Sequence, residues 1–314
     1  MNRKNSANED LGFGTKLGRH RERLINKDGS FNVRRTGGGL GAVHPYQVLI
    51  TLPWWQFWLT ITGSYLLLNA CFALLYVQLG VEQLSGWEAE MDHSWGHQFA
   101  YSFFFSVQTF TTVGYGAISP EGLPANLLAS LESMIGLLGF AVATGVVFGR
   151  FSRPSAKLAF SPRMVVSPYR KVNGLMFRMG NRRKNQLINL EVQVTVVMQD
   201  ERGKKVKQRF ERLALERERV TLFPLSWTVV HPINQDSPLH GLDAADLERM
   251  RAEILVVVQG YDDTFAQEVH VQTSYRWDEI LWGARFVPAF HTNDAGIIVL
   301  EVDKLGICER ATLN

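Results

Sequence analysis

The hexapeptide TTVGYG, residues 111–116, places glycine at alternate positions after a pair of threonines. Glycine adopts positive φ at little cost, so Gly114 and Gly116 allow successive peptide units to turn their carbonyl oxygens toward one side, instead of alternating as in a β-strand. The hydroxyl of Thr112 adds an oxygen below this column, and the valine and tyrosine are expected to point away and pack against surrounding helices. If four copies faced a common axis, the rings of oxygen could replace the hydration shell of a potassium ion.

The segment that must position this hexapeptide carries no Asp, Glu, Lys or Arg from Ser94 to Pro120. Its first part, WGHQFAYSFFFSVQTF, has the length of a short helix, with Phe99, Phe103 and Phe110 roughly on one face. Such a helix is too short to cross a bilayer, so we expect it to enter the membrane and turn back. Backbone that is neither helix nor barrel occurs at membrane depth only where it is buried in protein or lines a water-filled cavity. The hexapeptide is therefore predicted to line such a cavity.

Longer apolar runs flank this segment on both sides. There is no charged side chain between His44 and Glu82, and the run PWWQFWLTITGSYLLLNACFALLYVQLG exceeds the roughly 20 residues that a spanning helix needs. The second run, LPANLLASLESMIGLLGFAVATGVVFGRF, is interrupted only by Glu132 before Arg150. At a rise of about 1.5 Å per residue it is also long enough to cross, with some tilt. Both runs are predicted to be transmembrane helices, because their lengths fit poorly with buried helices of a soluble protein.

The distribution of charge predicts the orientation of these spans. Residues 1–43 are rich in Lys and Arg, and further basic side chains follow the second span. By the positive-inside rule both termini are then cytoplasmic, in a multi-pass protein of the cell's inner membrane. The connector between the spans is acidic, and its carboxylates include Glu82, Glu88, Glu90 and Asp92. An acidic outer mouth would concentrate cations in front of the spans.

After Lys157 the pattern changes to short runs with alternating polarity. The run LEVQVTVVMQ is followed by EILVVVQG, EVHVQTSYRW and GIIVLEV, with turn-forming residues such as Arg202-Gly203 between them. In the first run the apolar side chains at alternate positions are Leu190, Val192, Val194 and Val196. This spacing predicts an antiparallel, immunoglobulin-like β-sandwich.

Several stretches together carry a resemblance to a known family. TTVGYG between two spans resembles the potassium-channel signature. RLINKDGSFNV (23–33), HPINQDSPLHGL (231–242) and DEILW followed by GARFVP (278–288) resemble the cytoplasmic part of inward rectifier potassium channels. With FGRFSRPSAK (148–157) after the second span, the resemblance covers about residues 20–300. It looks closest to the prokaryotic branch, and the absence of the extracellular cysteine pair usual in animal members agrees with that placement.

The resemblance implies a fold and an activity. The fold is a membrane α-helical two-span pore, made of outer helix, pore helix, filter and inner helix, joined to a cytoplasmic all-β sandwich. The activity is K⁺ conduction by a homotetramer, with membrane lipids, including anionic lipids, as partners and modulators, and with no cofactor and no nucleic acid. The expected organisation is a cytoplasmic N-terminal segment (1–43), an interfacial slide helix (44–53), the pore domain (54–157), the sandwich (158–302) and a C-terminal tail (303–314).

The resemblance also implies roles for single residues. The filter ligands for K⁺, the only metal expected, are Thr112, Val113, Gly114 and Tyr115, supported by Thr111, Gly116 and Gln108. Phe148 lies where the inner helices narrow and is a candidate gate that closes by dewetting; the alternative is packing against lipid or a neighbouring helix. Inner-helix bending is implied at Gly136 and Gly145, with Gly139 between them, although small residues serve helix contact at least as often. Anionic lipid headgroups are implied to bind Arg150, Arg153 and Lys157, which also suit plain topology determination.

The chain departs from the family pattern in two places. Many members pair a glutamate of the pore helix with an arginine just after the filter, whereas this chain has Gln108 and then Ala117 and Ile118. That ion pair cannot form, so neutral hydrogen bonds are expected to brace the filter. The second departure is Phe140, in the cavity position where strong rectifiers carry an acid. Weak rectification is therefore expected.

Two other classes of protein compete with a channel. A potassium transporter subunit would need several imperfect copies of the span, loop and span unit, and the sequence contains one. A membrane-anchored enzyme or adaptor would act through the β domain, where His231, Asp236 and His240 lie close in sequence and Asp262-Asp263 form an acidic pair. No nucleophile, base and oxyanion donor, and no metal-ligand spacing, accompany these residues. They are better explained as polar loops of a β-sandwich.

Overall fold

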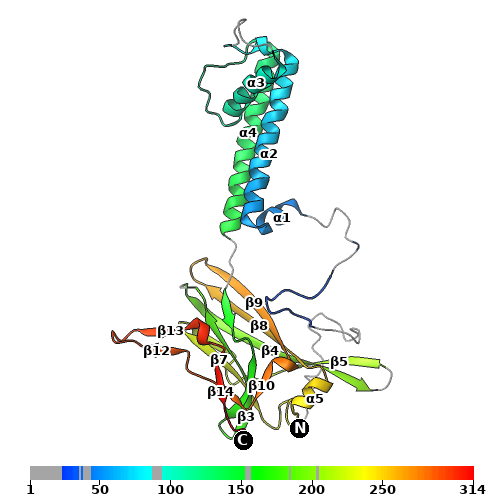
Figure 1. Ribbon diagram of the computed structural model, residues 1–314, viewed down its shortest axis with the longest axis vertical. Helices are drawn as coiled ribbons and strands as arrows, with labels where there is room; N and C mark the ends of the chain where they lie inside the picture. The colour runs from blue at the N-terminus through cyan, green and yellow to red at the C-terminus, as the bar shows by residue number, and fades with distance from the viewer. Residues whose placement is uncertain are drawn as a thin grey trace. The chain divides into compact units, whose positions relative to one another are not determined.

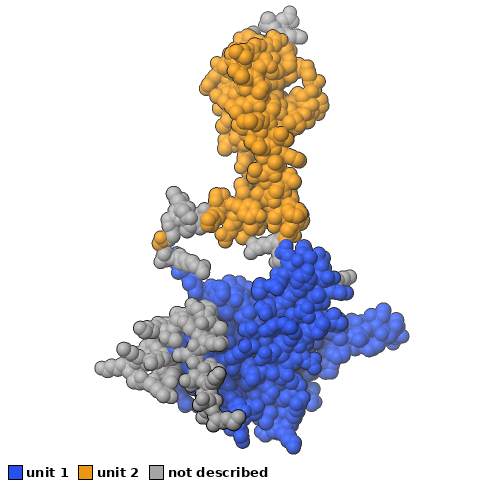
Figure 2. All heavy atoms as spheres, turned by 180° about the vertical axis from the view of Figure 1, so that it is seen from behind, with its two compact units in different colours: residues 1–36, 154–314 blue, residues 37–153 orange. Residues whose placement is uncertain are grey.

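The computed structural model describes residues 23–34, 37, 44–86, 94–152, 157–183, 185–202 and 205–314. The chain separates into two compact units, which are coloured separately in Figure 2. The helical unit is Gly37–Arg153, and the β unit combines Met1–Thr36 with Pro154–Asn314.

The helical unit contains the two predicted spans and the short helix between them (Figure 1). Helices α2 and α4 are long and apolar enough to cross a membrane, and α3 packs against both of them. A short α1 precedes α2, with a proline at its first position and Pro53 after its end, which fits the restriction that proline places on helices. The bounds are α1 Pro45–Thr51, α2 Trp54–Leu79, η2 Val81–Gln83, α3 Trp95–Phe110 and α4 Gly122–Phe151.

The described residues of the β unit form two five-stranded sheets. The first has the order β1-β3-β2-β10, with β7 on the other edge of β3, and the second has the order β5-β4-β8-β9, with β6 also paired to β4. Two small pairs, β11 with β14 and β12 with β13, lie outside them. The strands of the first sheet are β1 Leu158–Phe160, β2 Met164–Tyr169, β3 Val172–Asn181, β7 Ser226–Ile233 and β10 Ile280–Trp282. The second sheet contains β4 Leu187–Arg202, β5 Lys205–Arg212, β6 Arg219–Leu222, β8 Glu253–Asp262 and β9 Gln267–Arg276. The remaining elements are α5 Ala244–Arg249, η3 Trp277–Glu279, β11 Ala284–Phe286, β12 Phe290–Thr292, β13 Ile298–Leu300, η4 Val302–Lys304 and β14 Cys308–Arg310.

One hydrophobic core joins the inner faces of the two sheets. The alternating residues of β4 lie in it, as predicted, and each is at most 1% exposed: Leu190, Val192, Val194 and Val196. Phe177 of β3 and Tyr275 of β9 meet there at a ring-centroid distance of 5.9 Å. A sandwich of two sheets is confirmed, although β10 runs parallel to β2 and so departs from a fully antiparallel arrangement.

The β unit extends beyond the predicted domain limits at both ends. The segment expected to be a C-terminal tail after residue 302 contains β14, which pairs with β11. Asn314 also donates its backbone N–H to the side chain of Asn173 at 3.0 Å. At the other end, Ile25 and Phe31 form an isolated bridge in a segment that packs on the β unit. Long-range pairing, which leaves no local signal in the sequence, sets these limits.

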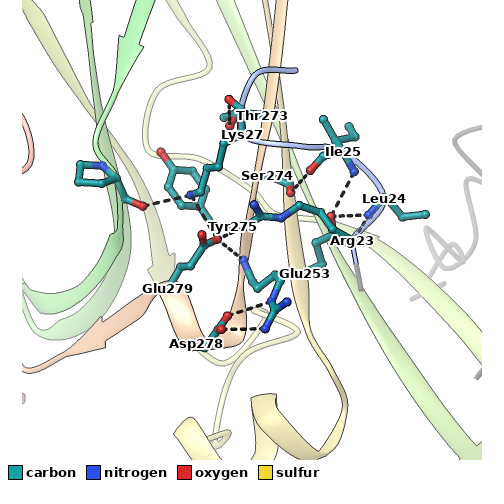
Figure 3. Close-up of polar contacts among 12 residues, drawn as sticks. Arg23, Leu24, Ile25, Lys27, Glu253, Thr273, Ser274, Tyr275, Asp278 and Glu279 are labelled. Atoms are coloured by element: carbon teal, nitrogen blue, oxygen red, sulfur yellow. Dashed lines mark hydrogen bonds and ion pairs between the residues drawn. The ribbon is translucent and has the colours of Figure 1, made fainter. Parts of the chain in front are cut away.

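Polar contacts anchor this N-terminal segment to β8 and β9 (Figure 3). The carboxylate of Glu253 accepts hydrogen bonds from the backbone N–H of Leu24 at 2.9 and 3.0 Å, and Ser274 donates to the carbonyl of Ile25 at 2.5 Å. Lys27 lies 3.7 Å from the ring centroid of Tyr275 and 3.2 Å from a carboxylate oxygen of Glu279. Burial lowers the pKa of Lys27 in this position, against the opposing effect of Glu279.

Candidate functional site

The backbone of TTVGYG alternates its conformation in the way that the glycine spacing predicts. The φ angle is +60° at Thr112, +53° at Gly114 and +81° at Gly116. Left-handed residues at every second position keep consecutive carbonyls from alternating between two sides. The sequence does not predict the positive φ of Thr112, because the left-handed backbone conformation is strained for a β-branched residue. The threonine therefore continues a pattern that the sequence marks only by its glycines.

The end of α3 holds the start of this segment. The backbone N–H of Thr112 donates to the carbonyl of Thr109 at 3.1 Å. The carbonyl of Gln108 accepts from Val113 at 3.0 Å and from Gly114 at 3.4 Å. The side-chain Oε1 of Gln108 is buried and has no hydrogen-bond partner within the described residues. Gln108 thus contacts the segment through its main chain, by neutral hydrogen bonds. Thr111 caps α3, and its hydroxyl donates to the carbonyl of Val107 at 2.7 Å.

Several of the predicted pore residues project away from the rest of their own chain. Val113 is 52% exposed and Tyr115 79% exposed, so neither is buried against helices of its own chain, and their packing against surrounding helices stays a prediction. On α4, Phe140 is 74% exposed and Phe148 is 71% exposed, two turns further along. These side chains are available for contact with other copies of the chain.

The glycines of α4 have different surroundings, although the helix runs unbroken through all of them. A Cβ on Gly136 would collide with the carbonyl oxygen of Phe110, the last residue of α3. At Gly139 it would touch only the Phe110 ring at 3.7 Å, and at Gly145 nothing lies within 4 Å. Gly136 therefore permits close approach of α4 to the end of α3, while bending at Gly136 or Gly145 stays a prediction.

A buried polar cluster lies behind α3, where the sequence showed only an isolated charge. Glu132 of α4 contacts Ser106 of α3 through Oε1, and accepts a hydrogen bond from Tyr76 of α2 on Oε2 at 2.8 Å. Ser106 also lies 3.0 Å from Asn69 Oδ1, on α2. Sequence reasoning missed this cluster, although an ionisable residue inside a span is itself a signal of function.

The basic residues after the second span are only partly described. Arg150 donates to the carbonyls of Leu49 at 2.5 Å and Leu52 at 2.7 Å, at the C-terminal end of α1. Its guanidinium lies 4.4 Å from the Trp54 ring centroid. Lys157 is exposed and belongs to the β unit, and Arg153 lies outside the described residues. Arg150 is thus already used to hold α1, a role that the sequence did not indicate.

We expect Arg150→Ala to release the C-terminal end of α1. Two charge-assisted hydrogen bonds would be lost, each worth about 1.5–3 kcal/mol. A spin label at Gln47, an exposed position of α1, should become more mobile in electron paramagnetic resonance spectra. Arg150→Lys is the matched control, because it keeps the charge but lacks the planar guanidinium that reaches both carbonyls. It therefore separates the effect of the charge from that of the two hydrogen bonds. Unchanged label mobility in Arg150→Ala would contradict the anchoring role.

Two of the polar residues that could have carried an enzymatic site, His231 and Asp262, are buried and hydrogen-bonded within the fold, whereas Asp236 and His240 are exposed. His231 is buried, with Nδ1 2.6 Å from the carbonyl of Ala214 and Nε2 2.7 Å from Ser237 Oγ, and burial lowers its pKa. Asp262 is buried and accepts from the backbone N–H of Thr264 at 3.0 Å. Within the described residues there is no group of three His, Cys, Asp or Glu side chains that could hold a metal ion.

A short helix that ends between two spans in alternating left-handed residues, with a β-sandwich on the same chain, is the architecture of a two-span ion channel. Residues 57–153 match the family model described as ion channel, and residues 158–310 match the inward rectifier potassium channel C-terminal domain. The chain is 39% identical over 296 residues to inward rectifier potassium channel Kirbac3.1 of Paramagnetospirillum magnetotacticum, covering 93% of this chain and 97% of that protein. It is 27% identical over 312 residues to ATP-sensitive inward rectifier potassium channel 8 of Rattus norvegicus, covering 90% of this chain and 73% of that protein.

The chain therefore belongs to the inward rectifier potassium channel family, on its prokaryotic branch. It is a membrane protein of an ion-channel family and not an enzyme. The alternatives of a transporter subunit and of a membrane-anchored enzyme or adaptor are not favoured.

Proposed function

We propose that the chain forms a homotetramer that conducts K⁺ selectively through rings of oxygen atoms from TTVGYG. The observation that carries this proposal is the alternation of left-handed backbone at Thr112, Gly114 and Gly116, directly after a short helix held between two spans. The ligands are the oxygens of Thr112, Val113, Gly114 and Tyr115. The C-terminal end of α3, with a partial negative charge of about half an elementary charge, favours a cation in the cavity below.

Ion flux into liposomes tests this proposal. The purified chain should support uptake of K⁺ or Rb⁺ that external Ba²⁺ blocks, with much less uptake of Na⁺. Assembly into four copies can be measured separately by light scattering in detergent. Sealed vesicles despite a folded tetramer would refute the proposal.

The same proposal assigns the gate, the orientation and the lipid contacts. Four copies of the exposed Phe148 could converge and close the pore by excluding water. Both termini and the β unit lie in the cytoplasm by the positive-inside rule. Anionic headgroups bind the basic residues that follow α4, and because Arg150 already holds α1, Arg153 and Lys157 are the better candidates for this contact.

Replacing Arg153 with Gln should weaken the response of the channel to anionic lipid. Each basic side chain near a membrane surface is worth about 1 kcal/mol of attraction to anionic lipid, or roughly fivefold in apparent affinity. The measurement is Rb⁺ flux in liposomes with an increasing fraction of phosphoinositide, and Arg163→Gln, in the β unit, is a charge-matched control. An unchanged dose response would leave Arg153 with a topological role alone.

Rectification should be weak in the native channel and strong in Phe140→Asp. In this family voltage drives cytoplasmic multivalent cations into the cavity, and Phe140 offers them no charge. Asp at this position would create up to four facing carboxylates, and because like charges repel one another only some of them need be ionised. Partial ionisation suffices, because each charge crossing the field is worth about 2.3 kcal/mol per 100 mV and a polyamine carries several.

The measurement is outward current in bilayers with and without spermine on the cytoplasmic side. Phe140→Asn is the matched control, since Asn is polar and has nearly the shape of Asp but carries no charge. Steep block of the native channel, or no added block in the Asp variant, would show that residue 140 does not set rectification.

A further inference from the structure

The cluster around Glu132 connects all three long helices of the helical unit. Asn69, Ser106 and Glu132 are 0% exposed, and Tyr76 is 1% exposed. Asn69 and Tyr76 come from α2, Ser106 from α3 and Glu132 from α4. Neither span carries a Lys or Arg before Arg150 that could neutralise a carboxylate here. A buried charge without a partner is costly, so the stability of the cluster depends on whether the carboxyl group of Glu132 is ionised or neutral.

The donors and acceptors around Ser106 determine the protonation state of Glu132. Asn69 donates from Nδ2 to the carbonyl of Tyr65 at 2.7 Å, which fixes its Oδ1 as the atom facing Ser106. An amide oxygen can only accept, so the single hydroxyl proton of Ser106 goes to Asn69. The contact between Ser106 Oγ and Glu132 Oε1 then needs a proton from the carboxyl group. Tyr76 already donates to the other carboxyl oxygen.

A neutral carboxylic acid therefore satisfies every polar side chain of the cluster. An ionised carboxylate would take the Ser106 proton and leave Asn69 Oδ1 without a donor among the described residues. A buried acceptor without a donor is destabilising.

The cluster also lies in register with the end of α3. Glu132 and Gly136 are one turn apart on α4, and they meet Ser106 and Phe110, which are one turn apart on α3. Between these two contacts lies Gln108, whose carbonyl accepts backbone hydrogen bonds from Val113 and Gly114 of the TTVGYG segment. The position of α3 along α4 therefore sets where that segment begins.

We propose that Glu132, as a neutral carboxylic acid, is the positioning residue that fixes α3 and hence the geometry of the selectivity filter. This inference rests on the proposed function, because the filter is assigned there. It also names a bracing group for a chain in which the ion pair between pore helix and filter cannot form. This bracing contact joins Glu132 of α4 to Ser106 of α3, and does not lie beside the filter itself.

The test compares Glu132→Gln with Glu132→Leu in the full-length channel. The Gln side chain is neutral and can donate to Ser106 while accepting from Tyr76, so it should keep the ratio of Rb⁺ to Na⁺ uptake. Leu has a similar volume but loses the hydrogen bonds to both Ser106 and Tyr76, and the ratio should fall at least about tenfold, the factor that corresponds to one of these two hydrogen bonds. If Glu132→Leu does not assemble, Ser106→Ala removes the bridging hydroxyl and should lower the ratio in the same way. The infrared difference spectrum between the native channel and Glu132→Gln should contain the band of a protonated carboxyl group.

Two results would overturn the proposal. One is a carboxylate band in place of the protonated carboxyl band, and the other is equal loss of selectivity in the Gln and Leu variants, which would mean that the charge is required. Failure of the proposed function is distinguishable, since the native channel itself would then lack selective flux while the infrared band is still present.

Discussion

Gly114→Ala should abolish selective K⁺ flux while the tetramer still assembles. At φ +53° an L-residue costs about 1–2 kcal/mol, and this strain would be repeated in every subunit around the pore. Nothing lies within 4 Å of a Cβ at Gly114 in its own chain, so the penalty comes from backbone conformation and not from a collision. The carbonyls are expected to turn away from the axis, and Na⁺ should then enter as readily as K⁺ or neither should pass. Uptake of Rb⁺ and Na⁺ into liposomes measures the outcome.

Gly96→Ala is the matched control for this substitution. Gly96 lies in α3 and has no positive φ, and a Cβ at this position would have nothing within 4 Å. Alanine is better tolerated than glycine in a helix, so flux should be unchanged. Selectivity for K⁺ over Na⁺ retained in Gly114→Ala would contradict the assignment of the filter.

The second large effect is expected from Gly136→Ala. The added Cβ would collide with a backbone carbonyl, that of Phe110, which cannot turn aside as a flexible side chain can. Overpacking of this kind costs about 1–3 kcal/mol, and the relief would be a shift of the end of α3 away from α4. Both thermal stability and selective flux should therefore fall, measured by the melting temperature of the purified channel and by Rb⁺ uptake.

Gly145→Ala places the same substitution on the same helix without a neighbour within 4 Å. Its melting temperature should equal or exceed that of the native channel, because alanine favours the helix. Equal melting temperatures of the two variants would disprove the close-packing role of Gly136. A hinge at Gly145 would appear as lost flux at unchanged stability.

Much of the fold follows from patterns that are local in sequence. The spans at α2 and α4 are indicated by long uncharged apolar runs, and the short helix α3 and the strand β4 by hydrophobic periodicity within a short window. The glycines of TTVGYG likewise signal their own backbone conformation. These features could be predicted because each segment carries its own signal.

The remaining features depend on contacts between distant segments. Glu132 was visible only as a charge within a span, since its partners come from two other helices. Arg150 was expected to meet lipid, and nothing in its neighbourhood indicates that the carbonyls of Leu49 and Leu52 lie within reach. The left-handed Thr112 contradicts its own residue preference, so no propensity could have predicted it. Tertiary structure decides such positions.

The anchored N-terminal segment has a consequence for how the chain folds. The β unit is made of the segments that precede and follow the helical unit in the sequence. The helical unit is therefore an insertion within a discontinuous domain. Leu24 meets Glu253 across a separation of 229 residues, so the first part of the domain to be synthesised must wait for β8. Both spans precede that strand in the sequence and are therefore synthesised before it. Closing so long a loop is slow compared with local folding, so the β unit is expected to complete its fold only after both spans have been made.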